Sequence, residues 1–200
     1  MSDKRLRYTA TDRNSAPILD VLRAILPTRG LAVDFASGSG EHAVYFARQL
    51  PALEFQPTDI NPQALDSIAA WTASEQLTNI RPPLFLDAAS PDWPIAAADA
   101  ALCVNMVHIA PWSATLGLLA GAAKILPTGA PLYLYGPYFR AGVETAPSNL
   151  AFDADLKRRN PEWGLRDLAA VAQAAAKAGF GPPTVFEMPA NNLSVVFRRL

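Results

Sequence analysis

The sequence contains one cysteine, two histidines and a net charge of only −1 among its 200 residues. A single cysteine cannot form an intrachain disulfide, and Cys103 stands in an apolar run, which favours a buried thiol over a nucleophile. So few histidines and cysteines argue against a metal site. The near-zero charge gives no electrostatic case for non-specific binding to nucleic acid or a membrane surface, and leaves only a local patch as a route to either.

Long hydrophobic runs are missing too, because none reaches the roughly 18 residues of a membrane-spanning helix. The first fourteen residues, MSDKRLRYTATDRN, are too polar for a signal peptide, so we expect a cytoplasmic protein. Internal repeats and low-complexity tracts are absent. Half of the residues are apolar, which predicts a single globular domain over residues 1–200. Within it we expect residues 1–14 to form an N-terminal arm. We expect the protein to be a monomer or a homodimer.

Helical and extended apolar patterns alternate along most of the chain. Helical spacing is present over 15–26, 41–50, 112–126 and 165–178, and in a segment that Asn61 and Pro62 open. Strand-like apolar runs cover 31–35, 54–59, 83–88, 100–105 and 131–136. This alternation predicts an α/β fold, in which helices cover both faces of a mostly parallel sheet.

Two later segments depart from the alternation. Residues 137–164 have no clear periodicity, and connections of that length are usually functional or disordered. Because this segment is rich in aromatic and charged side chains, we predict that it forms one wall of a substrate pocket. Residues 184–188 and 193–199 are joined by four turn-type residues, which predicts a C-terminal antiparallel hairpin.

The stretch LAVDFASGSGEHAVYFARQL predicts a ligand-binding turn between a strand and a helix. Gly38, Gly40 and Ala43 fit the dinucleotide pattern G-x-G-x-x-G/A. Glu41, however, would repel a phosphate at the helix start, and Asp34 before the turn suits a ligand with a positive end. S-adenosylmethionine (SAM) has this chemistry, because it carries adenosine, a sulfonium and an amino group but no phosphate.

Polar residues at the ends of the following strands extend this interpretation. Asp59 is placed to accept both ribose hydroxyls, Asp87 lies near an adenine amino group, and Asn105 lies at the mouth of the same crevice. From the other side, Arg13 could pair with the carboxylate of SAM. The residues expected to bind the cofactor are Arg13, Asn14, Asp34, Ala36, Ser37, Gly38, Gly40, Asp59, Ile60, Asp87 and Asn105.

With these features the sequence resembles the class I SAM-dependent methyltransferases, whose seventh strand is antiparallel. It is similar in particular to the DUF938 (UPF0585) family of methyltransferase-like proteins, over the segments DRNSAPIL, DFASGSGEHAVYFA, QPTDINP, VNMVHIAPW, LYLYGPYFRAG, SNLAFDADLKRRNPEWGLRDL and PANNLSVVFRR. The resemblance implies a seven-stranded Rossmann-like fold and SAM as cofactor, but no acceptor. Ala36 replaces the first glycine of many methyltransferases, a departure that we expect to be harmless.

A methyl transfer needs orientation, and a base where the nucleophile must lose a proton. His108, Tyr138 and Asp153 are the catalytic candidates, while His42 is expected to face solvent or to line the ligand as a bystander. Asn149, Trp163 and Arg166 are expected to contact the acceptor. We expect the five residues Tyr138, Asn149, Asp153, Trp163 and Arg166 to converge on one cavity. The alternatives are a structural histidine at His108 and an ordered surface loop whose Trp163 packs on the core.

Three functions are compatible with these features. The first is SAM-dependent methyl transfer to an unidentified, small-molecule acceptor. The second is a non-catalytic SAM-binding or interaction module, since no sharp catalytic motif such as N-P-P-Y follows the fourth strand, where NMVH stands instead. The third is a nicotinamide-dependent oxidoreductase, which Glu41 and the terminal hairpin disfavour.

Overall fold

The computed structural model describes residues 3–200. Its helices and strands follow one another as α1 (Thr9–Ile25), β1 (Gly30–Phe35), α2 (Glu41–Gln49), β2 (Leu53–Asp59), α3 (Pro62–Glu75), β3 (Leu84–Phe85), β4 (Ala100–Val104), α4 (Trp112–Ile125), β5 (Pro131–Gly136), β6 (Tyr138–Phe139), α5 (Pro147–Arg159), β7 (Arg166–Asp167), α6 (Leu168–Lys177), β8 (Thr184–Met188) and β9 (Asn192–Arg198). Short 3-10 turns, η1 (Met106–His108) and η2 (Pro189–Asn191), precede α4 and β9.

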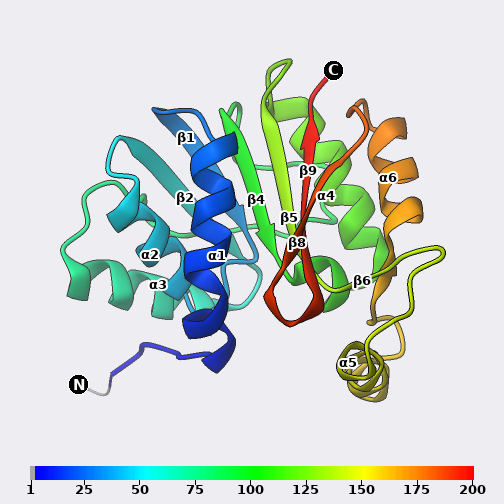
Figure 1. Cartoon of the computed structure of the whole chain (residues 1–200). Helices are drawn as coiled ribbons and strands as arrows, with labels where there is room; N and C mark the ends of the chain where they lie inside the picture. The colour runs from blue at the N-terminus through cyan, green and yellow to red at the C-terminus, as the bar shows by residue number, and fades with distance from the viewer. Residues whose placement is uncertain (1–2) are drawn as a thin grey trace.

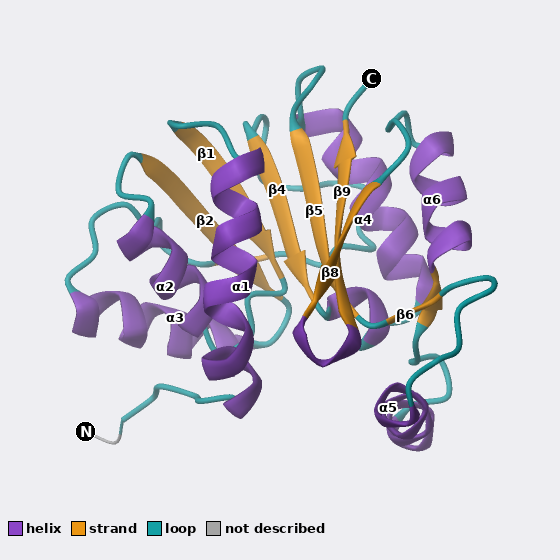
Figure 2. Cartoon of the chain, in the orientation of Figure 1, coloured by secondary structure: helices purple, strands orange, loops and turns teal. Residues whose placement is uncertain are grey.

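One sheet of seven strands has the order β3-β2-β1-β4-β5-β9-β8 (Figure 2). Its first five strands pair in parallel. Strand β9 runs antiparallel to both neighbours, β5 and β8. The sheet confirms the predicted architecture, including the antiparallel strand of the C-terminal hairpin. A separate pairing of β6 with β7 forms a small parallel ribbon.

Helices cover both faces of the sheet, as predicted (Figure 1). On one face, α1, α2 and α3 contribute Leu22, Phe46 and Trp71 to an apolar core. On the other face, α4 and α6 form a second core. Successive residues of β4 enter opposite cores, with Leu102 on the α1 side and Cys103 on the α4 side. Cys103 is therefore a buried free thiol.

Helix α1 begins earlier than the sequence indicated. The arm expected over residues 1–14 is wrong from Thr9 onward, because those residues belong to α1, and residues 1–2 lie outside the described residues. The Thr11 amide donates to the Tyr8 carbonyl, and Thr11 and Asn14 are buried. The polar end of α1 thus packs against the rest of the chain.

Three other boundaries differ from the sequence prediction. The strand expected over 83–88 is reduced to β3, and the helix expected over 165–178 begins only at Leu168, because β7 pairs with β6. The segment 137–164 contains the 13-residue helix α5. In the part of the chain described here, every helix is too short or too polar to cross a bilayer.

Candidate functional site

A cavity of about 490 Å³ lies at the carboxyl ends of β1, β2 and β4, the edge where open parallel sheets bind ligands. The start of α1, the turn between β1 and α2, and Trp163 also line it. Figure 1 shows the N-terminal segment and α5 at this same end of the sheet. The volume is typical of small-molecule sites. Across residues 3–200, no group of three or more His, Cys, Asp or Glu side chains could hold a metal ion.

The turn between β1 and α2 needs glycine because its backbone is left-handed and closely packed. Gly40 has a φ of 88°, and a Cβ there would stand 2.8 Å from the Ile68 Cα in α3. Gly38 has a φ of 59°. Ala36 shares this conformation with a φ of 54°, which is unusual for a residue with a side chain. The turn brings α2 close to α3 and leaves Gly38 on the cavity wall.

Asp59, at the end of β2, fixes this turn. Its Oδ2 accepts the Gly38 amide at 2.9 Å, and its Oδ1 accepts the Asn61 amide at 2.9 Å. The carboxylate is buried and lines the cavity. Each oxygen keeps a second acceptor position, so the group can still bind hydroxyls of a ligand.

Asp34, near the end of β1, is only 3% exposed and lines the same cavity. Within the described chain its Oδ2 has no hydrogen-bond partner. Burial, together with the nearby charge of Asp59, raises the pKa of the Asp34 carboxyl to about 7. A buried carboxylate of this kind is complementary to a cationic group, which would restore an ordinary pKa.

The carboxylate of Glu41 occupies the start of α2. Its Oε2 accepts the Ser39 hydroxyl at 2.8 Å and the Tyr8 amide at 2.8 Å. The helix terminus where a dinucleotide pyrophosphate would bind thus already carries a negative group with protein partners. This geometry agrees with the argument from sequence against a phosphate at the turn.

Eight of the eleven residues expected to bind a cofactor line the cavity. They are Asp34, Ala36, Ser37, Gly38, Asp59, Ile60, Asp87 and Asn105. Gly40 is buried behind the turn, and Arg13 is exposed on α1, outside the lining. Asn14 is buried beside the lining, where its Oδ1 lies 2.8 Å from His42 Nε2.

Several further lining residues were not singled out by the sequence, and three of them are polar residues near the turn. Tyr8 and Thr11 come from the N-terminal segment and the start of α1, and Thr58 from β2. His42 was expected either to face solvent or to line the ligand as a bystander; it lines the cavity, and burial lowers its pKa to about 4. The prediction for Arg13 and Asn14 pointed to the correct region, but the observed start of α1 at Thr9 determines which side chains of this region face the cavity.

The structure places the catalytic candidates outside the cavity lining. His108 is fully buried, its Nδ1 accepts the Arg166 amide at 3.4 Å, and its ring packs edge-on against Tyr138 with centroids 4.7 Å apart. Burial and the Arg166 charge lower the pKa of His108 to about 3. Tyr138 and Asp153 are buried as well, and Asp153 accepts the Leu165 amide at 2.8 Å.

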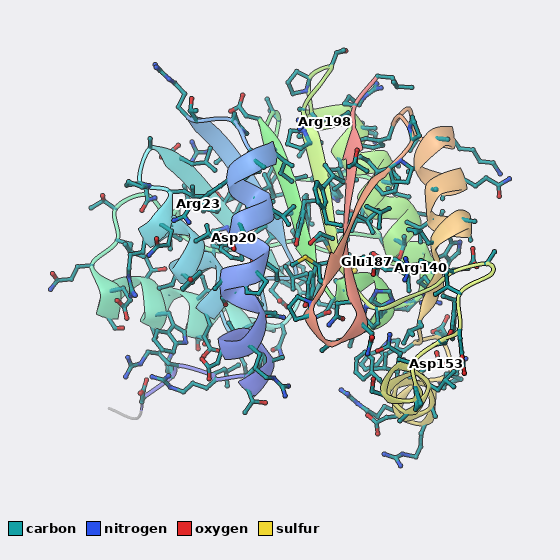
Figure 3. The ribbon with its side chains drawn as sticks, viewed as in Figure 1. Asp20, Arg23, Arg140, Asp153, Glu187 and Arg198 are labelled. Atoms are coloured by element: carbon teal, nitrogen blue, oxygen red, sulfur yellow. The ribbon has the colours of Figure 1, made fainter. Side chains whose placement is uncertain are left out.

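The expected convergence of five residues on one cavity is wrong for four of them, since only Trp163 lines it. Arg166 donates instead to the carbonyls of Val107 and Ala110. Asn149 donates to the Asn191 carbonyl at 2.9 Å, at the hairpin turn. Figure 3 shows Asp153 on α5, below Arg140 and Glu187, which form an ion pair between the segment and β8. The four predicted residues that do not line the cavity therefore make contacts within the protein instead.

The fold is similar to that of solved methyltransferases. An O-methyltransferase family protein from Burkholderia thailandensis aligns with a TM-score of 0.80 at 18% identity, covering 95% of this chain and 57% of that chain. The mitomycin 7-O-methyltransferase MmcR gives 0.82 at 16% identity, with 96% and 55% covered. Human N-acetylserotonin methyltransferase in complex with SAM gives 0.76 at 16%, with 95% and 52% covered.

The chain spans just over half the length of these proteins, so the likeness concerns the fold that they share with it. At the level of sequence, the family model described as "Protein of unknown function (DUF938)" matches residues 5–199. That match covers nearly every residue of the sheet, the cavity and the connecting segments. The chain therefore belongs to the DUF938 family and has the class I methyltransferase fold.

Proposed function

We propose that the protein binds SAM in the cavity and transfers its methyl group to a small-molecule acceptor. The observation that carries this proposal is the buried Asp34 carboxyl beside the Gly-rich turn, with one oxygen unpaired within residues 3–200. When bound, SAM supplies an activated methyl carbon, and its sulfonium and ammonium groups are complementary to this carboxylate. The proteins of known structure that share the fold include SAM- and SAH-bound methyltransferases.

The lining residues divide the cavity into two proposed parts. Asp59 would accept the ribose hydroxyls, and Ile60 and Asp87 would contact the adenine, because they follow β2 and β3 at the same edge. The backbone around Gly38 and Asn105 would hold the remainder of the cofactor. Protein groups on this side thus orient the cofactor rather than react with it.

The other part of the cavity is apolar and supports an uncharged acceptor. Met106, Ile109, Ala110 and Trp163 line it, and the described lining contains no lysine or arginine that could pair with an anionic acceptor. Trp163, whose ring centre lies 5.2 Å from the Arg159 guanidinium, would offer its remaining aromatic surface to a planar molecule. Fold relatives named as mitomycin 7-O-methyltransferase and N-acetylserotonin methyltransferase are consistent with a small planar acceptor.

A second candidate function is a SAM-binding module without catalysis. The observation in its favour is that His108, Tyr138 and Asp153 lie outside the cavity lining, where they make structural contacts. A nicotinamide-dependent oxidoreductase is disfavoured by the Glu41 carboxylate at the start of α2.

Calorimetric titration with SAM, with its demethylated product S-adenosylhomocysteine (SAH) and with NAD tests cofactor binding. We expect both sulfur compounds to bind, and Asp59→Asn to weaken SAH binding by roughly 1.5–3 kcal/mol, the range for hydrogen bonds to charged groups. Binding of NAD without SAH would contradict the proposal. Transfer of labelled methyl from SAM to a panel of phenols, thiols and amines then separates the enzyme from the binding module.

A further inference from the structure

Residues 4–8, here called the strap, run in extended form across α3 before α1 begins. The Leu6 amide donates to Ser67 Oγ at 2.8 Å, and the Leu6 carbonyl accepts Trp71 Nε1 at 2.9 Å. Lys4 forms an ion pair with Asp66 at 2.9 Å. Figure 1 shows this segment passing below α3 toward the lower end of α1. The strap is therefore bound to α3 along its length.

Trp71 strengthens this attachment through two cations. The guanidinium groups of Arg5 and Arg7 lie 4.9 and 4.6 Å from the centre of the Trp71 ring. Arg5 also donates to Ser74 at 3.2 Å. Trp71 is buried, whereas Arg5 is half-buried and Arg7 is exposed. A cation–π contact with an exposed cation contributes about 0.5–1 kcal/mol, so the two arginines favour one path of the strap.

Two side chains connect the strap directly to the Gly-rich turn. Ser67 Oγ accepts the Leu6 amide and donates to the Ser39 carbonyl at 2.6 Å. Glu41 Oε2 accepts both the Tyr8 amide and the Ser39 hydroxyl. Because Ser39 lies within the turn, the position of the strap and the geometry of the turn depend on each other.

This network holds Tyr8 at the cavity. The ring lines the cavity, and its Cε2 lies 3.4 Å from the position that a Cβ on Gly38 would occupy. Yet Tyr8 is 51% exposed, so much of the ring is not covered by protein. A large aromatic side chain held at the cavity wall while half exposed has apolar area available for a ligand.

We propose that Tyr8 is a cofactor-binding residue that covers the site from the N-terminal side, and that Ser67 and Glu41 are positioning residues that hold it there. This inference rests on the proposed function, because it takes the cavity to bind SAM and SAH. Covering the ligand with an aromatic ring removes apolar surface from water and slows the escape of the ligand.

The test compares SAH binding to the full chain and to Tyr8→Ala, Tyr8→Phe and Ser67→Ala. Calorimetry should give a dissociation constant roughly tenfold higher for Tyr8→Ala, since an aromatic contact of this size is worth about 1.5 kcal/mol. Stopped-flow measurements should show most of this change in the dissociation rate. Tyr8→Phe keeps the ring and should bind within about twofold of the parent chain.

Leu116→Ala is the matched control, because Leu116 is a similarly exposed apolar residue on α4, outside the cavity lining. Ser67→Ala should raise the dissociation rate of SAH without removing any group from the cavity wall. Equal SAH affinity of the parent chain and Tyr8→Ala, with both chains folded by circular dichroism, would overturn the role of Tyr8 and leave the proposed function intact. A parent chain that fails to bind SAH would overturn both.

Discussion

A buried carboxyl group beside the turn makes the stability of the folded chain depend on pH. The pKa of Asp34 is about 7 when folded, because of burial and the charge of Asp59, against an ordinary value of 3.8. Between these values the unfolded chain loses the proton and the folded chain keeps it. Stability from this group is therefore complete below pH 3.8 and falls as the pH rises toward 7.

We expect Asp34→Asn to remove this dependence. Relative to the parent chain, the free energy of unfolding of the variant should rise between pH 4 and pH 7, by up to about 4 kcal/mol for a shift of this size. Urea unfolding at several pH values measures it. Asp20→Asn is the control, since Asp20 is exposed on α1. A constant difference between Asp34→Asn and the parent would contradict the assigned pKa.

At the same scale, sequence position predicted the cavity lining better for the proposed cofactor residues than for the proposed acceptor residues. Asp34, Asp59 and Asn105 lie at or next to the ends of strands, and parallel strands bring their carboxyl ends to one edge. His108 lies only three residues beyond Asn105, but Asn105 has a φ of 65° and the following 3-10 turn directs His108 into the protein. Spacing along the chain did not reveal that reversal of direction.

Among the secondary-structure elements, the contact between α2 and α3 depends on one glycine. We expect Gly40→Ala to lower the free energy of unfolding by about 2–4 kcal/mol. The alanine would have to adopt a left-handed conformation, and its Cβ would lie only 2.8 Å from the Ile68 Cα. Thermal unfolding measures the loss.

Gly142→Ala provides the comparison for this variant. Gly142 is also left-handed, with a φ of 73°, but no described atom lies within 4 Å of the added Cβ. The Gly142→Ala variant should therefore lose only the free energy needed to hold an alanine in the left-handed conformation, about 1–2 kcal/mol. Equal losses in the two variants would mean that the contact with α3 adjusts at no cost.

The buried strands and amphipathic helices were predictable because their apolar residues repeat with the period of each element. Helix α5 was not, because it buries only Asn149, Asp153 and Leu156. Two of these residues are polar, so no apolar period marks the helix. Its contacts are specific hydrogen bonds, such as that of Asn149 with the Asn191 carbonyl, and partners 42 residues apart cannot be inferred from local pattern.

For the molecule as a whole, the half-buried His42 and the buried His108 oppose Asp34 as the pH falls. Burial lowers the pKa of His42 to about 4 and, with the charge of Arg166, that of His108 to about 3, from an ordinary 6.5. The unfolded chain thus binds these protons first. Stability from each histidine is complete above pH 6.5 and is lost on acidification, on the order of 3 kcal/mol apiece by pH 4.

We therefore expect the free energy of unfolding of His108→Gln to rise by about 3 kcal/mol relative to that of the parent chain as the pH falls from 7 to 4. This expectation holds whatever the stability of the variant at pH 7. Urea unfolding across this range measures the difference. Over the same range the parent chain should lose less stability than the two histidines alone would cost, because the contribution of Asp34 has the opposite sign. A difference between variant and parent that stays constant with pH would show that His108 takes up its proton in the folded chain as readily as in the unfolded one.

The place of β9 in the sheet bears on how the chain acquires its structure during synthesis. Strand β9 follows every other strand in the chain, yet it lies between β5 and β8 and hydrogen-bonds to both. Until its residues leave the ribosome, the edge of β5 stays open, and Val195 and Phe197 are missing from the core. An open apolar edge can pair with another chain. Nascent chains should thus be most prone to association while β9 has not yet emerged from the ribosome.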